Sequence, residues 1–277
     1  MAANVCSELR LRCSENNMGT SDTACTLAEL CICAAAEAWR GDGEVLATGI
    51  TLIPRLAAGL ARLTVNEELM MTDGECHLVA EPVPVGPRTG SVIEGWMPYA
   101  RTFELLWGGR RHAMVVPTQI DRFGQANISV VGDYARPKTA LLGVRGFPGN
   151  SVHHPNSYFV PSHTSRTFVA GEVDMVCGAG YNPARWPDGW RPGGLDLRLI
   201  VTDLAVLDFG GPRHQIRVRH LHPGSTFEQV QDNTPFPLAR SGPVWMTPAP
   251  SAEQLYIIRE VLDPHGQRES VFKGRSA

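Results

Sequence analysis

A strand, a helix and a second strand follow one another between residues 44 and 71, and this succession constrains the fold more than any other feature. Apolar residues in 44–48 and 68–71 predict two short strands, and leucines at helical spacing between them predict a helix. A strand–helix–strand unit of about 30 residues joins two parallel strands, because the helix carries the chain back to the starting edge. We therefore predict an α/β fold with an open, mostly parallel sheet and flanking helices.

The turns that follow these two strands are the first candidates for a functional site. Ligands of open α/β sheets lie outside the carboxyl ends of the strands. Gly49 and Thr51 follow the first strand, and Asp73 and Glu75 follow the second. Simpler explanations exist for each: a strand–helix turn for the first pair, an Asp-Gly turn for Asp73 and a solvated surface acid for Glu75. Spacing alone leaves both explanations open.

Strands and helices keep alternating to the end of the chain, without a repeat or a linker. Residues 1–20 are polar and lack periodicity, so we expect an N-terminal extension that is disordered or precedes the true start. Residues 21–277 are expected to form a single domain. Within it, 140–144 is predicted as a strand and 151–165 as a long polar loop. Three capping boxes are expected to open helices, at Thr26–Glu29, Ser225–Glu228 and Ser251–Gln254.

Composition excludes several classes of function. Hydrophobic residues make up 43% of the chain and charged residues 19%, which is typical of a globular protein. The net charge of −3 argues against nucleic acid or anionic lipid as a partner. No apolar run reaches the roughly 20 residues of a membrane span, and the charged start lacks a secretory signal, so we expect a cytoplasmic protein. The nine histidines and seven cysteines show no zinc spacing, and we expect no metal site.

Five segments together carry a resemblance to a known family. They occur in order along the chain: Thr26–Glu29, Gln119–Asn127, Gly143–Gly146, Val201–Asp208 and Leu221–Val230. In this order they resemble the first helix, a Gln-Val and Ala-Asn stretch, a Gly-rich loop and the C-terminal signature of class I CoA-transferase β subunits. The resemblance spans residues 24 to about 265 and implies the CoA-transferase (NagB/RpiA-like) fold.

Four further segments resemble one branch of that family, the β subunits of steroid-ring-opening CoA hydrolases. They are Glu94–Pro98, Trp107–His112, Val144–Asn150 and Asp208–Pro212. The resemblance implies an α2β2 heterotetramer with a CoA-transferase-like α subunit. It also implies an acyl-CoA substrate whose last steroid ring is opened by hydrolytic C–C cleavage. CoA is then part of the substrate, no other cofactor is expected, and the acting base is a glutamate of the α subunit.

One departure from the family pattern bears on the chemistry. Class I transferases carry a catalytic glutamate in a Ser-Glu-Asn-Gly-like turn, and this glutamate forms a covalent intermediate with CoA. Here the turn is Thr72–Glu75, with Asp73 in the place of the glutamate. Aspartate withdraws the carboxylate by roughly 1 Å, and a misplacement of that size can cost about 10²-fold in rate. The hydrolase hypothesis has two alternatives: the chain is a true CoA-transferase β subunit, or it is a non-catalytic structural subunit.

The resemblance suggests further contacts for the substrate. Trp96 and Tyr99 are candidates to wall the ring pocket, and Arg145 to face substrate carboxylates or a CoA phosphate. Asn150 is a candidate to place an amide beside the thioester. Core or interface aromatics, a surface ion pair and a turn residue are the respective alternatives.

Overall fold

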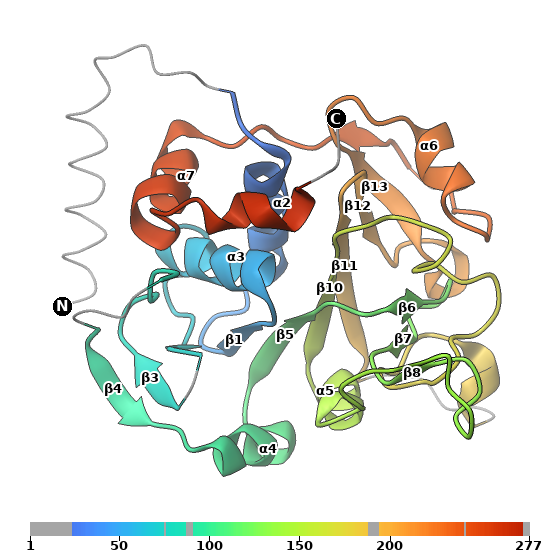
Figure 1. Ribbon diagram of the computed structural model, residues 1–277, viewed down its shortest axis with the longest axis horizontal. Helices are drawn as coiled ribbons and strands as arrows, with labels where there is room; N and C mark the ends of the chain where they lie inside the picture. Colours follow the sequence, from blue (N-terminus) through green and yellow to red (C-terminus); the bar gives the residue numbers. More distant parts are fainter. Residues whose placement is uncertain (1–23, 75, 87–90, 188–193, 241, 274–277) are drawn as a thin grey trace. The chain divides into compact units, whose positions relative to one another are not determined.

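The computed structural model describes residues 24–273, apart from 75, 87–90, 188–193 and 241 (Figure 1). The chain divides into two compact units, residues 1–102 with 248–277 and residues 103–247. The predicted extension over 1–20 lies outside the described residues. The division into compact units does not test the predicted single domain over 21–277, which stays a prediction.

The first unit packs helices around a short strand. Helix α2 packs against α3, and α3 packs against β1 (Figure 1). Cys31, Ile32 and Ala35 of α2 are fully buried, as expected for a helix that is apolar all round. The helical segments are α2 (Leu27–Ala36), η1 (Glu37–Trp39), α3 (Leu52–Leu63), the start of α4 (Tyr99–Gly108), α7 (Ala252–Tyr256), η4 (Ile257–Leu262) and η5 (Gln267–Phe272).

The strands of the first unit confirm the predicted strand–helix–strand succession. They are β1 (Leu46–Gly49), β2 (Met71–Thr72), β3 (His77–Val79) and β4 (Ile93–Trp96). Leu46 forms a parallel bridge with Met70 on the way into β2, and the N–H of Ala47 donates to the Met70 carbonyl at 2.9 Å. The β2, β3 and β4 strands then form an antiparallel sheet. This return brings the start of β3 back beside the end of β2.

The second unit is built around a sheet with the strand order β5-β10-β11-β12-β13-β14. Strands β5, β10 and β11 run parallel, β12 and β13 return antiparallel, and β14 is parallel to β13. Fully buried side chains such as Tyr158, Ile200 and Leu207 form its core. The strands are β5 (Arg111–Val115), β10 (Pro155–Val160), β11 (Asp196–Thr202), β12 (Ala205–Asp208), β13 (Arg217–Leu221) and β14 (Trp245–Met246).

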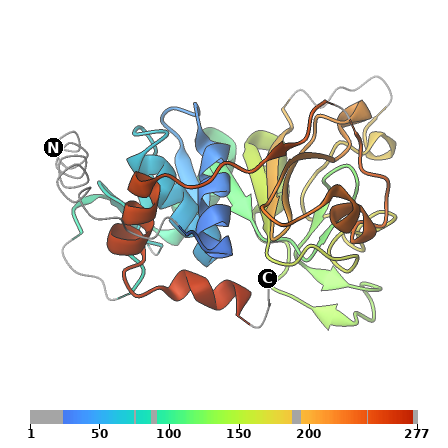
Figure 2. The ribbon, with the colours of Figure 1, turned by 90° about the horizontal axis from the view of Figure 1, so that it is seen from above.

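Smaller elements complete the second unit. The β8 and β9 strands pair with each other as a hairpin that extends away from the larger sheet (Figure 2). These elements are β6 (Gln119–Ile120), β7 (Ala126–Asn127), β8 (Val130–Val131), β9 (Thr139–Ala140), α5 (Phe147–His153), η2 (Pro183–Arg185), η3 (Pro212–His214) and α6 (Phe227–Asp232).

Three predictions about local structure need correction. The polar loop predicted over 151–165 contains the end of α5 and the buried strand β10. The strand predicted over 140–144 is wrong, because β9 ends at Ala140 and the residues that follow are partly or fully exposed. The second capping box lies one residue later than predicted: Thr226, not Ser225, caps α6, with Gln229 as its partner. The boxes at Thr26 and Ser251 are confirmed.

Two histidines of the second unit are buried among hydroxyl and carbonyl groups. The ring nitrogens of His163 lie 3.1 Å from the Thr202 hydroxyl and 2.8 Å from the Thr234 hydroxyl. His222 lies 2.8 Å from the Thr247 hydroxyl and 2.8 Å from the Thr202 carbonyl. Burial lowers the pKa of His163 to about 3 and that of His222 to about 4, because the charged form loses its hydration.

The free energy of unfolding is therefore expected to fall as the pH drops from the ordinary histidine pKa of 6.5 towards about 4. In that window the unfolded chain binds protons that the folded chain refuses, at about 1.4 kcal/mol per pH unit for each histidine. Urea unfolding of the full chain at a series of pH values measures this slope. The variant His163→Gln should reduce it, and an unchanged slope in that variant would contradict the assignment.

Candidate active site

The carboxyl ends of β1 and β2 lie at the same edge, since these neighbouring segments run parallel. Gly49 ends β1, Thr51 precedes α3, and Asp73 directly follows β2. The structure thus brings together the residues that sequence spacing selected, at the edge where α/β folds bind ligands. Glu75 lies outside the described residues, and its predicted role stays a prediction.

The turn from β1 into α3 is tightly constrained. A Cβ atom on Gly49 would lie 2.2 Å from the Pro54 carbonyl oxygen and 2.5 Å from the Arg55 nitrogen, so only glycine fits. Thr51 has φ 77° and ψ 177°, a conformation that residues with a side chain rarely adopt. Such strain, of order 1–3 kcal/mol, is often retained at functional sites. The close packing of this turn against the first turn of α3 accounts for Gly49, and the predicted ligand contacts of Gly49 and Thr51 stay a prediction.

The Asp73 carboxylate is buried and fully engaged. Its side chain is 8% exposed. Oδ1 accepts the backbone N–H groups of Cys76 at 3.1 Å and His77 at 3.2 Å. Oδ2 lies 3.1 Å from Nδ1 of His77, and the N–H of Asp73 donates to the His77 carbonyl at 3.0 Å. The carboxylate therefore closes the turn and holds the imidazole.

His77 is a candidate residue that sequence reasoning missed. It opens β3, and its side chain is 36% exposed. Across the antiparallel pair it lies directly opposite Trp96, so both side chains stand on one face of the sheet. The available signal was an aspartate followed four residues later by a histidine, around an Asp-Gly turn. Without the antiparallel return of β3, that spacing does not predict a contact.

Cys76 lies beside the same imidazole but does not form a catalytic relay with it. Its Sγ is 3.7 Å from Nδ1 and 3.9 Å from Nε2 of His77. A nucleophile–histidine–carboxylate relay needs the nucleophile and the carboxylate on opposite ring nitrogens. Here Nδ1 faces the Asp73 oxygen and is also the nitrogen nearer to the sulfur. The geometry therefore favours an aspartate–histidine pair over a cysteine nucleophile.

The two predicted aromatic residues are strongly exposed. Trp96 ends β4 and is 73% exposed, and Tyr99 opens α4 and is 63% exposed. Burial in the core of this chain, one of the alternatives, is thus wrong for both. A role as pocket wall or as subunit interface stays a prediction.

Arg145 and Asn150 lie in the second unit. Arg145 has φ 48°, a left-handed conformation, in the turn before α5. Asn150 is 3% exposed, and its Nδ2 donates to Oδ1 of Asn156 at 2.6 Å. Among the described residues, Asn150 Oδ1 is the buried side-chain oxygen without a hydrogen-bond partner. The amide links α5 to β10, and its predicted place beside a thioester stays a prediction.

The Gln119–Asn127 segment has a structural role in the second unit. Asn127 donates to the Gln119 amide oxygen at 2.7 Å, and Gln119 donates to Asp174 at 2.9 Å. Burial raises the pKa of Asp121 to about 7, although the N–H groups of Phe123 and Gln125 act in the opposite direction. These contacts give the amides of Gln119 and Asn127 a structural role within the second unit of this chain.

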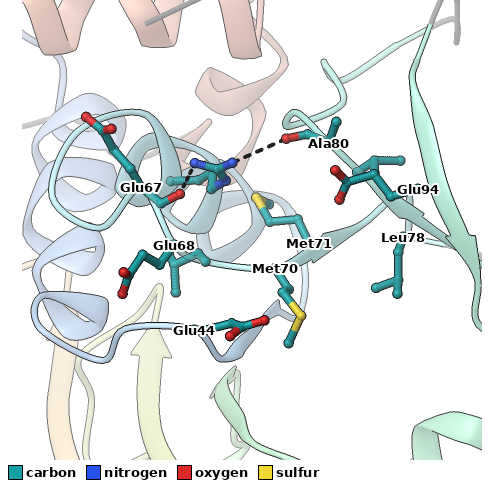
Figure 3. A pocket seen from close by; sticks show the side chains of 11 residues that line it. Glu44, Glu67, Glu68, Met70, Met71, Leu78, Ala80 and Glu94 are labelled. Atoms are coloured by element: carbon teal, nitrogen blue, oxygen red, sulfur yellow. Dashed lines mark hydrogen bonds between the residues drawn. The ribbon is translucent and has the colours of Figure 1, made fainter. Parts of the chain in front are cut away.

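A hollow of about 330 Å³ opens in the first unit near β2 and β3 (Figure 3). Its lining includes Glu44, Glu67, Glu68 and Glu94, together with Arg62. A second hollow of about 350 Å³ lies in the other unit and is lined by residues including Gln125 and Trp186. Neither hollow is lined by a predicted site residue.

The described part of the chain holds no candidate for a metal site or a membrane span. Its histidine, cysteine and acidic side chains form no group of three that could hold a metal ion. Among its helices, none is both long and apolar enough to span a bilayer.

Comparisons with known proteins place the chain in a family, although no protein-family model matches it. It is 42% identical to the cholesterol ring-cleaving hydrolase IpdB subunit of Rhodococcus jostii, over 91% of this chain and 98% of the relative. The crystal structure of Rhodococcus jostii IpdAB matches with a TM-score of 0.83, covering 89% of this chain and 98% of the matched chain.

Two CoA-transferases are more distant relatives. One subunit of the 3-oxoadipate CoA-transferase of Pseudomonas knackmussii is 30% identical over 82% of this chain and 91% of its own length. The glutaconate CoA-transferase structure from Acidaminococcus fermentans matches with a TM-score of 0.74 at 26% identity, covering 88% of this chain and 97% of the matched chain. The predicted CoA-transferase fold is confirmed. The chain belongs to the family of cholesterol ring-cleaving hydrolase IpdB subunits, which is related to CoA-transferase subunits.

Proposed function

We propose that this chain is the β-type subunit of a two-subunit hydrolase that opens the last ring of a cholesterol-derived CoA thioester. The observation that carries the proposal is 42% identity to the Rhodococcus jostii IpdB subunit over nearly the full length of both chains. The partner is a CoA-transferase-like α subunit in an α2β2 assembly. CoA belongs to the substrate, no further cofactor takes part, and the complex works in the cytoplasm.

The reaction adds one water across a ring C–C bond. A carboxylate base of the partner subunit removes a proton from water, and the resulting hydroxide adds to the ring ketone. The C–C bond then breaks, the former ketone carbon becomes a carboxylate, and the electron pair moves into a thioester enolate. Protonation of the enolate carbon completes the balance, so the product is the substrate plus one water with its CoA retained. Preorganised donors stabilise the enolate during this step.

The residues of this chain have supporting roles in the proposal. The constrained turn at Gly49 and Thr51 presents backbone to the substrate, and the exposed rings of Trp96 and Tyr99 offer apolar walls for the steroid remnant. Arg145 supplies a cation for a substrate carboxylate or a CoA phosphate, and Asn150 supports the thioester end.

A CoA-transferase is the second candidate, favoured by 30% identity to a 3-oxoadipate CoA-transferase subunit. Transfer needs a free carboxylate that can attack the thioester carbonyl. The Asp73 oxygens are occupied by the N–H groups of Cys76 and His77 and by the imidazole, which counts against that role.

Product analysis of the assembled complex distinguishes the two candidates. The complex is incubated with the cholesterol-derived ring-ketone CoA thioester and an acceptor acid, and part of the mixture is trapped with hydroxylamine. The hydrolase proposal predicts a CoA-bearing product heavier by one water and no modified carboxylate in this chain. CoA on the acceptor acid, with a hydroxamate on Asp73 or Glu75 in the peptide mass spectrum, would establish transfer instead.

A further inference from the structure

The contact between Asp73 and His77 determines which ring nitrogen carries a proton. An ionised carboxylate only accepts hydrogen bonds, so Nδ1 of His77, at 3.1 Å from Oδ2, must be the donor. The other nitrogen, Nε2, is then the atom that takes up and releases a proton. In other sites where a buried carboxylate orients a histidine, Nδ1–H likewise bonds the carboxylate and Nε2 transfers the proton.

Backbone hydrogen bonds fix the segment that carries the imidazole. The Asp73 N–H donates to the His77 carbonyl at 3.0 Å, and the Met97 N–H donates to the Cys76 carbonyl at 2.6 Å. His77 therefore belongs at once to the turn after β2 and to the β3–β4 pair. With its backbone fixed and Nδ1 bonded to Asp73, the imidazole loses little further freedom when a substrate binds.

Exposure assigns different roles to the two members of the pair. The Asp73 side chain is 8% exposed, with both oxygens engaged, whereas the His77 side chain is 36% exposed. Opposite His77 on the same face stands Trp96, which is 73% exposed. A ligand that contacts this face meets the imidazole and the indole before it meets the carboxylate.

We propose that His77 is the residue of this subunit that protonates the thioester enolate, and that Asp73 is its positioning residue. The inference deepens the proposed function and rests on it. As the ring C–C bond breaks, Nε2–H of the imidazolium gives its proton to the enolate carbon and a C–H bond forms. The neutral imidazole then takes a proton from solvent, and the partner base releases to solvent the proton it took from water. One water is consumed, and no oxidant or reductant is needed.

The test compares His77→Asn and His77→Gln in the assembled complex. Asparagine can keep the hydrogen bond to Asp73 but has no Nε2, whereas glutamine places an amide near Nε2 that cannot transfer a proton. We expect both variants to lower kcat by about 10²-fold or more, with KM nearly unchanged. Both should also lose the exchange of the product's α-hydrogen for deuterium when the ring-opened thioester is incubated with the complex in heavy water.

The control is His265→Asn, at an exposed histidine of the same unit, which should keep the wild-type kcat and exchange rate. Size-exclusion chromatography verifies assembly of each complex. Wild-type rates of ring opening and exchange in either assembled His77 variant would overturn the inference and leave the proposed function standing. A wild-type complex that does not open the ring would overturn the proposed function and the inference with it.

Discussion

Replacing Asp73 by alanine in the assembled complex is expected to lower kcat by at least about 10²-fold, because a misplaced proton donor costs that much. The substitution removes the partner of His77 Nδ1 and the acceptor of two backbone N–H groups. The imidazole is then free to rotate and to change its tautomer. The two N–H groups that lose their acceptor are partly buried, so each loss costs up to about 1 kcal/mol and the turn itself loosens. Steady-state kinetics of the purified complex measure the change.

The variant Asp73→Asn is the matched control for the loss of turn structure. Its Oδ1 can still accept the N–H groups of Cys76 and His77. Its NH2 group, which replaces Oδ2, cannot accept a hydrogen bond from Nδ1–H. We expect it to assemble like the wild type and still to turn over slowly. Unchanged turnover in both variants, with intact assembly, would reduce this chain to a structural subunit.

Replacing Glu29 by alanine is expected to reduce the free energy of unfolding by about 3–5 kcal/mol. Glu29 is fully buried and lies 2.7 Å from Nε of Arg259 and 2.9 Å from Nη2 of Arg268. Burial alone would raise the pKa of Glu29, but the hydrogen bonds from Arg259 and the Thr26 N–H, with the charge of Arg268, hold it below its ordinary value. Without the carboxylate, Arg268 keeps Asp263 as a partner at 3.0 Å but remains buried with one counterion fewer.

A second glutamate of the same unit provides the matched control. Glu37 forms an exposed ion pair with Arg40 at 2.6 Å, with the glutamate side chain 42% exposed. Exposed pairs contribute about 0–1 kcal/mol, so Glu37→Ala should be nearly neutral. Urea unfolding of both variants gives the comparison. Equal effects of the two substitutions would contradict the importance of the buried cluster.

Local patterns in the sequence predicted those parts of the fold that depend on local physics. The capping boxes at Thr26 and Ser251 form as expected, because the hydroxyl and the third helical residue meet within one turn. At 225–229 two overlapping capping-box patterns, Ser225–Glu228 and Thr226–Gln229, fit the sequence equally well. The structure uses Thr226 with Gln229, and nothing within that pentapeptide distinguishes the two registers.

Strand β10 was missed because its polar residues are buried. Asn156 is fully buried, and its Nδ2 donates to the carbonyls of Asn150 and His154. Ser157 is fully buried and lies 3.0 Å from Nε2 of His112 on β5. Hydropathy counts such residues as surface, whereas tertiary hydrogen bonds make them suitable for a core strand. The sequence alone therefore predicted a loop.

The candidate site also contains features that the sequence predicted and features that only the structure shows. The position of Asp73 follows from strand order, because turns after parallel strands meet at one edge. Its pairing with His77 follows from the antiparallel return of β3, which a strand–helix–strand pattern does not contain. The strained backbone at Thr51 is likewise visible only in three dimensions.

Water labelled with oxygen-18 gives the most direct measurement of what this subunit helps to do. The assembled complex is supplied with the ring-ketone CoA thioester in that solvent, and the product is analysed by mass spectrometry. Addition of water to the ring predicts one labelled oxygen in a new carboxylate of a product that still carries CoA. Label found only in a free acid released from CoA, or an unlabelled thioester of another acid, would contradict hydrolytic ring opening.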